Sequence, residues 1–231
     1  MLEIIDLSQE IFTGMPVFPG LPEVKISLYV SHEEWDSIPA SDVVSPAVNR
    51  LELGEHTGTH VDAINHMARQ YRGQSIDTMP LSMFYTEAIC LDLSYKGLRE
   101  LIEPADLERA LSEAGLDIKP GDTVLLYTDH YRRAFGTDDW QDGPGISVAA
   151  ARWLGQQGIA AFGVETMAPG VLHVSNKEVH LICGELDFTH YENMVNLHQL
   201  VGRGRFRFIG LPLKIRGGTG SPVRAVAVFE G

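Results

Sequence analysis

Residues 56–66 of this 231-residue chain read HTGTHVDAINH, which places three histidines and one aspartate within a short stretch. Imidazole nitrogens and carboxylate oxygens are typical protein ligands of Zn²⁺ and Mn²⁺. A lone buried histidine is more often a hydrogen-bonded core residue. Four such side chains around a glycine are difficult to explain by packing alone, so the stretch predicts a metal site.

The backbone of this stretch must bend if its side chains are to share one ion. In a straight strand, which rises about 3.3 Å per residue, His56 and His60 would lie roughly 13 Å apart. In a single helix these two would share a face, but Asp62 would point about 200° away from His60. Gly58 can adopt backbone angles that are closed to other residues. We therefore expect a sharply bent loop or bulged strand, which a short helical turn could follow.

The four polar side chains suggest a division of roles. We expect His56, His60 and Asp62 to bind the metal and to leave one coordination position open for water, as catalytic sites do. His66 lies four residues beyond Asp62 and can face the site without being a ligand. An imidazole titrates near pH ~6.5, which suits a general acid and base that moves a proton from the attacking water to the leaving group. The alternative is that His66 is a fourth ligand that closes the site.

This stretch resembles the signature of the metal-dependent cyclase family, His-x-Gly-Thr-His-x-Asp-x-Pro-x-His. The family includes bacterial kynurenine formamidase, isatin hydrolase and trans-dienelactone hydrolase. All metal and catalytic positions of the signature match, and the departure is Ile64, where the family usually has proline. Weaker similarities lie at 6–8, 15–20, 211–214 and 220–225, so the resemblance runs from end to end of the chain.

A second segment is similar to the other metal-binding region of the family. His180 precedes Glu192 by twelve residues, and Glu192 opens the run ENMVNL at 192–197. The resemblance implies that His180 and Glu192 complete the metal centre, in which Asp62 and Glu192 bridge two ions in dinuclear members. It also implies Zn²⁺ or Mn²⁺ as cofactor, with one or two ions per chain. The alternative for His180 is a histidine on the surface of a helix.

Phe18 is the predicted substrate contact. It stands where kynurenine formamidases usually have tryptophan in a Pro-x-x-Trp-Pro-Gly context, so an aromatic ring that can stack on a flat substrate is retained, without the indole N–H. The other histidines have weaker assignments. We expect His190 and His198 to support the ligands around Glu192, and His32, His130 and His173 to lie at the surface.

Composition favours a single domain over residues 1–231, because a chain of this length with 44% hydrophobic residues can bury one core. The net charge of −13 argues against nucleic acid or an anionic membrane as a partner. No signal peptide is visible and no run reaches the ~18 apolar residues of a membrane span, so we expect a cytoplasmic protein. Cys90 and Cys183 lie in apolar runs and should be reduced core residues.

Helices alternate with strands only in the middle of the chain, which predicts an α/β fold with a mixed sheet. Pro104 and Gly115 should bound one helix, and Ser147 and Gly158 a second. Strands are expected at 2–7, 26–30, 48–53, 88–93, 123–128, 159–164, 206–211 and 223–229, and a further helix at 192–200. The resemblance implies that the sheet is β-barrel-like, with flanking helices.

The resemblance implies an enzyme, namely a metal-dependent amidohydrolase that cleaves a C–N amide bond in a small aromatic or cyclic substrate. Aryl formamides and isatin-like rings are the family precedents. A lactone hydrolase of the trans-dienelactone type is the alternative, because a metal polarises both carbonyls alike. A third hypothesis is a non-catalytic metal-binding protein with a closed coordination site. By resemblance we also expect a homodimer whose ligand is a small-molecule substrate.

Overall fold

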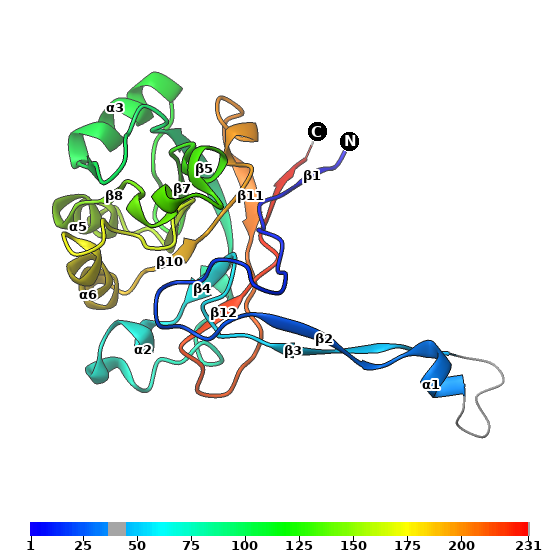
Figure 1. The fold of residues 1–231 in the computed structure, drawn as a ribbon. Helices are drawn as coiled ribbons and strands as arrows, with labels where there is room; N and C mark the ends of the chain where they lie inside the picture. Colours follow the sequence, from blue (N-terminus) through cyan, green and yellow to red (C-terminus); the bar gives the residue numbers. More distant parts are fainter. Residues whose placement is uncertain (37–44, 231) are drawn as a thin grey trace.

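The computed structural model describes residues 1–36 and 45–230. Within this part of the chain, a curled nine-stranded sheet forms the centre of the molecule (Figure 1). Its strands follow the order β1 (Glu3–Asp6), β13 (Val226–Phe229), β11 (Phe206–Ile209), β5 (Tyr85–Asp92), β7 (Thr123–Tyr127), β9 (Ala161–Val164), β10 (Thr189–Glu192), β4 (His60–Asp62) and β12 (Gly220–Pro222). The neighbours β5, β7, β9 and β10 run parallel, and the other neighbouring pairs run antiparallel. The predicted α/β fold with a mixed sheet is therefore confirmed.

The sheet separates two apolar layers, because successive side chains of a strand point to opposite faces. On β5, Ile89 and Leu91 join one cluster of buried side chains, whereas Ala88 and Cys90 join the other. Three helices, which also connect the parallel strands, cover the face of Ile89 and Leu91 (Figure 1). They are α3 (Pro104–Ala114), α5 (Val148–Gln156) and α6 (Asn176–Leu186).

Local signals decide where α3 and α5 begin and end. Pro104 occupies the first turn of α3, and the Asp106 carboxylate accepts the Glu103 N–H at 2.8 Å. Gly115 adopts a φ of +64°, a left-handed conformation that ends the helix. Ser147 begins α5 by accepting a backbone N–H at 3.1 Å. Both helices agree with the sequence prediction to within one or two residues.

Two strands outside the main sheet form an arm that projects from the body of the molecule (Figure 1). These are β2 (Lys25–Val30) and β3 (Val48–Glu52), and every residue of β3 is exposed. Other short elements are α1 (His32–Asp36), α2 (Ile64–Met67), α4 (His130–Ala134), the pair β6 (Leu101–Ile102) and β8 (Gly145–Ile146), and 3₁₀ turns at Arg69–Tyr71, Leu81–Met83, Asp138–Asp142 and Leu197–Gln199. None of the helices in residues 1–36 and 45–230 has the length and apolar character that a membrane span requires.

The predicted helix at 192–200 is wrong. Glu192 is the last residue of β10, and only Leu197–Gln199 forms a 3₁₀ turn. Asn193 and Asn196 adopt left-handed φ angles of 53° and 61°. Single left-handed residues interrupt a right-handed helix, and asparagine tolerates them better than most residues. The segment therefore continues from a strand into tight turns.

His130 is also placed differently from the prediction. It was expected at the surface, but its side chain is completely buried in α4. The ring stacks on Trp140 with centroids 5.2 Å apart, and Nε2–H donates to the Trp140 carbonyl at 3.0 Å. His32 and His173 are exposed, as expected. Among the described residues, Cys90 and Cys183 are buried free thiols.

A buried carboxyl group, Glu165, follows the end of β9 and is 1% exposed. Its Oε2 accepts the Thr128 N–H at 2.8 Å, the Thr128 hydroxyl at 3.0 Å and the His130 N–H at 3.3 Å. Burial outweighs these hydrogen bonds and raises the pKa of Glu165 to about 7. This group should therefore link the stability of the fold to pH.

We expect Glu165 to lower the stability of the protein as the pH rises from 5 to 8. The unfolded chain ionises near the ordinary pKa of 4.5, whereas the folded chain keeps the proton up to about pH 7. The folded state thus binds more protons in this window and loses stability as they leave. Glu165→Gln cannot ionise and should reduce the loss by up to about 3 kcal/mol. Denaturant unfolding of both proteins at pH 5 and pH 8, in a chelating buffer, measures the difference. Parallel pH profiles would contradict the assignment.

Candidate metal centre

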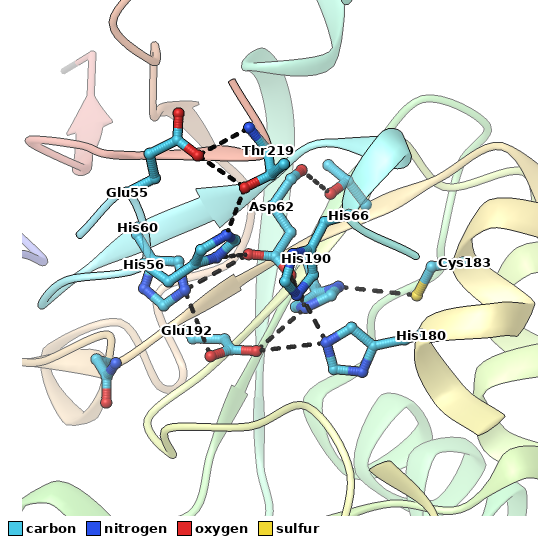
Figure 2. A network of polar contacts seen from close by, with 12 residues as sticks. Glu55, His56, His60, Asp62, His66, His180, Cys183, His190, Glu192 and Thr219 are labelled. Atoms are coloured by element: carbon cyan, nitrogen blue, oxygen red, sulfur yellow. Dashed lines mark hydrogen bonds and ion pairs between the residues drawn. The ribbon is translucent and has the colours of Figure 1, made fainter. Parts of the chain in front are cut away.

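The centre is built first on two neighbouring strands. β4 and β10 pair antiparallel, with His60 opposite Glu192 and Val61 opposite Tyr191, and the same register continues to Asp62 and His190. Alternate residues of a strand share a face. His60 and Asp62 of β4 therefore meet His190 and Glu192 of β10, as Figure 2 shows.

A bend at Gly58 carries the preceding residues back towards this face. Gly58 has a φ of +58°, and its carbonyl accepts His60 Nδ1–H at 2.8 Å and Asn193 Nδ2–H at 3.1 Å. The bend brings His56 Nδ1 to 2.7 Å from Asp62 Oδ1. The backbone is thus curled around His56, His60 and Asp62, as the sequence predicts.

Two more imidazoles come from helices. His66 lies on α2 directly after β4, and its Nε2 is 3.6 Å from Asp62 Oδ2. His180 lies on α6, where Nδ1–H donates to the Asn176 carbonyl at 2.7 Å and Nε2 lies 3.6 Å from Asp62 Oδ2. His180 is therefore on a helix but points into the cluster rather than to solvent (Figure 2).

The structure separates the two histidines that flank Glu192. His190 is completely buried, with Nε2 3.3 Å from Asp62 Oδ2 and 3.2 Å from Glu192 Oε1. His198 is exposed and lies beside Tyr127, with ring centroids 6.4 Å apart. Only His190 joins the cluster, and the period-two pattern THYE at 189–192 was the signal that it shares a face with Glu192.

Four imidazoles of the cluster use one ring nitrogen outside it and present the other to the carboxylates. His60 and His180 donate Nδ1–H to carbonyls, and His190 Nδ1 contacts Cys183 Sγ at 3.8 Å. His56 Nε2 contacts the Thr219 hydroxyl at 3.1 Å, and that hydroxyl donates to Glu55 Oε2 at 2.7 Å (Figure 2). Hydrogen bonds of this kind orient metal-binding histidines and fix their tautomer. Sequence reasoning did not find these three residues. Thr219 lies far along the chain from His56, Glu55 reaches the cluster only through Thr219, and Cys183 was assigned to the core.

The two carboxylates divide the cluster into two donor groups. One oxygen of each carboxylate faces the first donor group, His56 and His60. Asp62 Oδ1 lies 2.7 Å from His56 Nδ1 and 3.5 Å from His60 Nε2, and Glu192 Oε2 lies 3.4 Å from His60 Nε2. The other oxygens, Asp62 Oδ2 and Glu192 Oε1, face the second donor group, His180 and His190, whose Nε2 atoms lie 3.2 to 4.0 Å away. Ligand atoms of a tetrahedral zinc ion with bonds of about 2.1 Å lie about 3.4 Å apart. Asp62, His180, His190 and Glu192 can therefore share one divalent cation, because their ligand atoms all lie within 4.8 Å of one another, and the same holds for His56, Asp62 and His66.

The charges of these groups are strongly linked. Burial opposes ionisation of Asp62, but the imidazoles of His190, His180 and His56 hold its pKa well below the usual range. Burial likewise opposes protonation of His190, yet Asp62 and Glu192 raise its pKa well above the ordinary value. Bound protons thus neutralise the carboxylates in the metal-free chain, and a cation would have to replace those protons.

The cluster lies at one side of a cavity of about 310 Å³. Phe18, Met67 and Met167 supply apolar parts of its wall, and His66 and Asn193 supply polar parts. Phe18 also packs against the buried cluster of Ala134, Trp140 and Met167. The cavity has the size of small-molecule sites, which begin near 300 Å³.

We expect His60→Ala to abolish metal binding at the first donor group. It removes His60 Nε2, which lies 3.5 Å from Asp62 Oδ1 and 3.4 Å from Glu192 Oε2. Elemental analysis of protein purified without added metal, and again after loading with Zn²⁺ and desalting, measures the ions held per chain. A thermal melt of the metal-free variant serves as the control for folding. Retention of the wild-type metal content would show that His60 is not a ligand.

The chain is similar to known proteins in sequence and in fold. The sequence model of the family described as "Putative cyclase" matches residues 5–171. Kynurenine formamidase of Salinibacter ruber is 29% identical over 226 residues, with 97% of each chain covered. Isatin hydrolase of Roseibium aggregatum is 27% identical over 247 residues and covers 98% of this chain and 92% of its own. The structure of isatin hydrolase A from Ralstonia solanacearum superposes with a TM-score of 0.84 at 28% identity, covering 99% of this chain and 92% of that chain. The family match spans most of the sequence, and this protein therefore belongs to the cyclase family.

Proposed function

We propose that this protein is a metal-dependent hydrolase that uses an activated water to cleave a C–N amide bond in a small aromatic or cyclic substrate. The observation that carries the proposal is the buried histidine–carboxylate cluster, which opens on a cavity with an aromatic residue, Phe18, in its wall. The relatives named kynurenine formamidase and isatin hydrolase support an aryl formamide or an isatin-like ring as the substrate class.

We assign five residues as ligands of Zn²⁺ or Mn²⁺: His56, His60, Asp62, His180 and Glu192. The arrangement of the carboxylates favours two ions, because Asp62 and Glu192 each turn one oxygen towards either donor group. A divalent cation held there would polarise the substrate carbonyl and make water more acidic. The protein contributes the orientation of the donors and a largely buried site.

We assign His66 as the general acid and base. Burial is the main cause that lowers the pKa of His66, and the imidazoles of His56 and His180 add to it. The ring is therefore neutral at neutral pH and can accept the proton of an attacking water. Within the described residues, His66 is the imidazole of the cluster without an outer hydrogen bond, and it is also the most exposed at 37%. These features suit a group that receives a proton, turns and delivers it to the departing nitrogen.

The substrate would enter between Phe18 and the metal cluster. Phe18, Met67 and Met167 offer apolar contact for a flat ring, while Asn193, which follows Glu192 in the chain, adds a polar side chain to the cavity wall. The most favourable contact for an aromatic side chain in this position is with a planar group that stacks on its ring. A preference for aromatic over aliphatic formamides would therefore be expected.

Turnover of a substrate panel by the metal-loaded protein tests this function. The panel contains an aryl formamide, an aliphatic formamide, isatin and an unsaturated lactone, and hydrolysis of the aromatic amides is expected to be fastest. Turnover of the lactone alone would replace the amidohydrolase assignment with a lactone hydrolase. Metal binding without turnover of any compound would favour a non-catalytic metal protein.

We further propose that the chain forms one catalytic domain over 1–231 and assembles as a homodimer. The projecting arm supports the assembly, because its apolar residues Leu28, Tyr29, Val48 and Leu51 are between 46% and 69% exposed. Exposed apolar side chains gathered on one element are typical of interaction surfaces. Light scattering of the purified protein should give the mass of two chains, and a monomer mass at micromolar concentration would contradict the dimer.

We expect His66→Ala to reduce kcat by ~10²-fold or more while the bound metal is retained. The variant removes the proton carrier and leaves all five assigned ligands in place. His198→Ala, which changes an exposed histidine outside both donor groups, is the matched control and should keep wild-type activity. Elemental analysis accompanies the kinetics of each variant. Full activity of His66→Ala would remove the acid and base role, and loss of metal would make His66 a ligand instead.

A further inference from the structure

We propose that His190 is a further metal ligand in the second donor group and that Cys183 positions it. The inference rests on the proposed function for the presence of an ion, and it adds a residue to the five ligands assigned above. The role considered for His190 from the sequence was support of neighbouring ligands. Its position in the structure is closer to the carboxylates than that role requires.

His190 lies closer than His180 to both carboxylates of the second donor group. His190 Nε2 lies 3.3 Å from Asp62 Oδ2, compared with 3.6 Å for His180 Nε2. It lies 3.2 Å from Glu192 Oε1, compared with 4.0 Å for His180 Nε2. The four donor atoms of Asp62, His180, His190 and Glu192 are all within 4.8 Å of one another. Any ion that His180 and the two carboxylates hold would therefore also lie beside His190.

The backbone explains why His190 reaches this position. It is two residues before Glu192 on β10, so both side chains leave the same face of the strand. The β4–β10 register continues to Asp62 opposite His190, just as His60 stands opposite Glu192. The two cross-strand pairs thus form a square of two imidazoles and two carboxylates. His60 and His190 hold diagonal positions in this square and are equivalent in their relation to the carboxylates.

The outer contacts of His190 match those of the assigned ligands. Its Nδ1 faces Cys183 Sγ at 3.8 Å, its ring lies 5.6 Å from the Phe162 ring, and the ring of His180 meets it edge-on at 4.8 Å. Burial raises the pKa of the Cys183 thiol, which keeps the sulfur uncharged. When Nδ1–H donates to this weak sulfur acceptor, Nε2 carries the lone pair and points towards the carboxylates. Cys183 is thus a positioning residue, equivalent to the carbonyls that orient His60 and His180.

The fourth donor makes the two groups alike in number. Each group then has two imidazole nitrogens and two carboxylate oxygens, and four donors is the number that structural zinc sites use. The groups differ in burial, because His56, His60 and His180 line the cavity whereas His190 is completely buried. We infer that His190 retains the ion of the second group from the side that faces away from the substrate.

In the competing interpretation, His190 stays protonated and forms ion pairs with both carboxylates. A protonated ring between Asp62 and Glu192 would neutralise the carboxylates and hold β4 against β10 without binding metal. The two interpretations differ in an observable way. A ligand loses the Nε2 proton when metal binds, whereas a protonated ion-pair partner keeps it.

Zinc titration of the metal-free protein by calorimetry, with elemental analysis after desalting, tests the inference. We expect two ions per wild-type chain. In His190→Phe, which keeps an aromatic ring beside Phe162, one ion should remain tight and the affinity for the other should fall by about 100-fold or more. Cys183→Ala should weaken the same ion by about 10-fold. His198→Phe, the same change at an exposed histidine, should leave both ions unaffected.

Nitrogen-15 NMR of histidine-labelled wild-type protein covers the case in which His190→Phe fails to fold. The His190 resonance is assigned by its loss in the milder His190→Gln variant, and addition of Zn²⁺ should remove the Nε2 proton. Retention of that proton, or unchanged zinc affinity in a folded His190→Phe variant, overturns the ligand role while the metal-dependent function stands. A wild-type chain that binds no zinc overturns both the ligand role and the proposed function.

Discussion

The sharing of two buried carboxylates, Asp62 and Glu192, between imidazoles on opposite sides is the interaction on which the rest of the site depends. Each carboxylate turns one oxygen to either donor group. This is possible because β4 and β10 are direct antiparallel neighbours, so that a residue of one strand stands opposite a residue of the other. A shift of β4 by one residue in this register would turn His60 and Asp62 away from the face that carries His190 and Glu192.

Burying this many ionisable groups is unfavourable unless each has a partner. A buried charge without compensation costs several kcal/mol, and removal of one partner leaves that penalty in place. In this cluster, outer hydrogen bonds to Gly58, Asn176 and Thr219 occupy the second nitrogen of three imidazoles. The inner nitrogens are then held by the carboxylates alone. Such preorganisation suits a cation, because the donors need little rearrangement when protons leave.

The surrounding fold serves this arrangement in two ways. The parallel strands β7 and β9, with the helices α3 and α5, provide an apolar base against which β10 and α6 pack. The antiparallel strands β4 and β12 extend the sheet beyond that base, and the loops before and after β4 carry the bend at Gly58 and the turn with His66. His60, Asp62 and Glu192 thus come from strands and His180 from the helix α6, while the residue assigned to proton transfer, His66, comes from the short helix α2. This division follows the general pattern in which catalytic groups lie on short connections supported by a rigid scaffold.

The sequence by itself determined that His56, His60 and Asp62 gather at one place, because they lie within one bend that contains Gly58. It also determined the ends of α3 and α5, because proline, serine and glycine act locally at helix termini. Only the tertiary structure decided that His190 joins the cluster, since that depends on β10 pairing with β4 and on Glu192 closing a strand rather than opening a helix. The physical reason is the distance along the chain over which each interaction acts. Capping and backbone bends depend on neighbours in the chain, whereas strand pairing brings together residues about 130 positions apart.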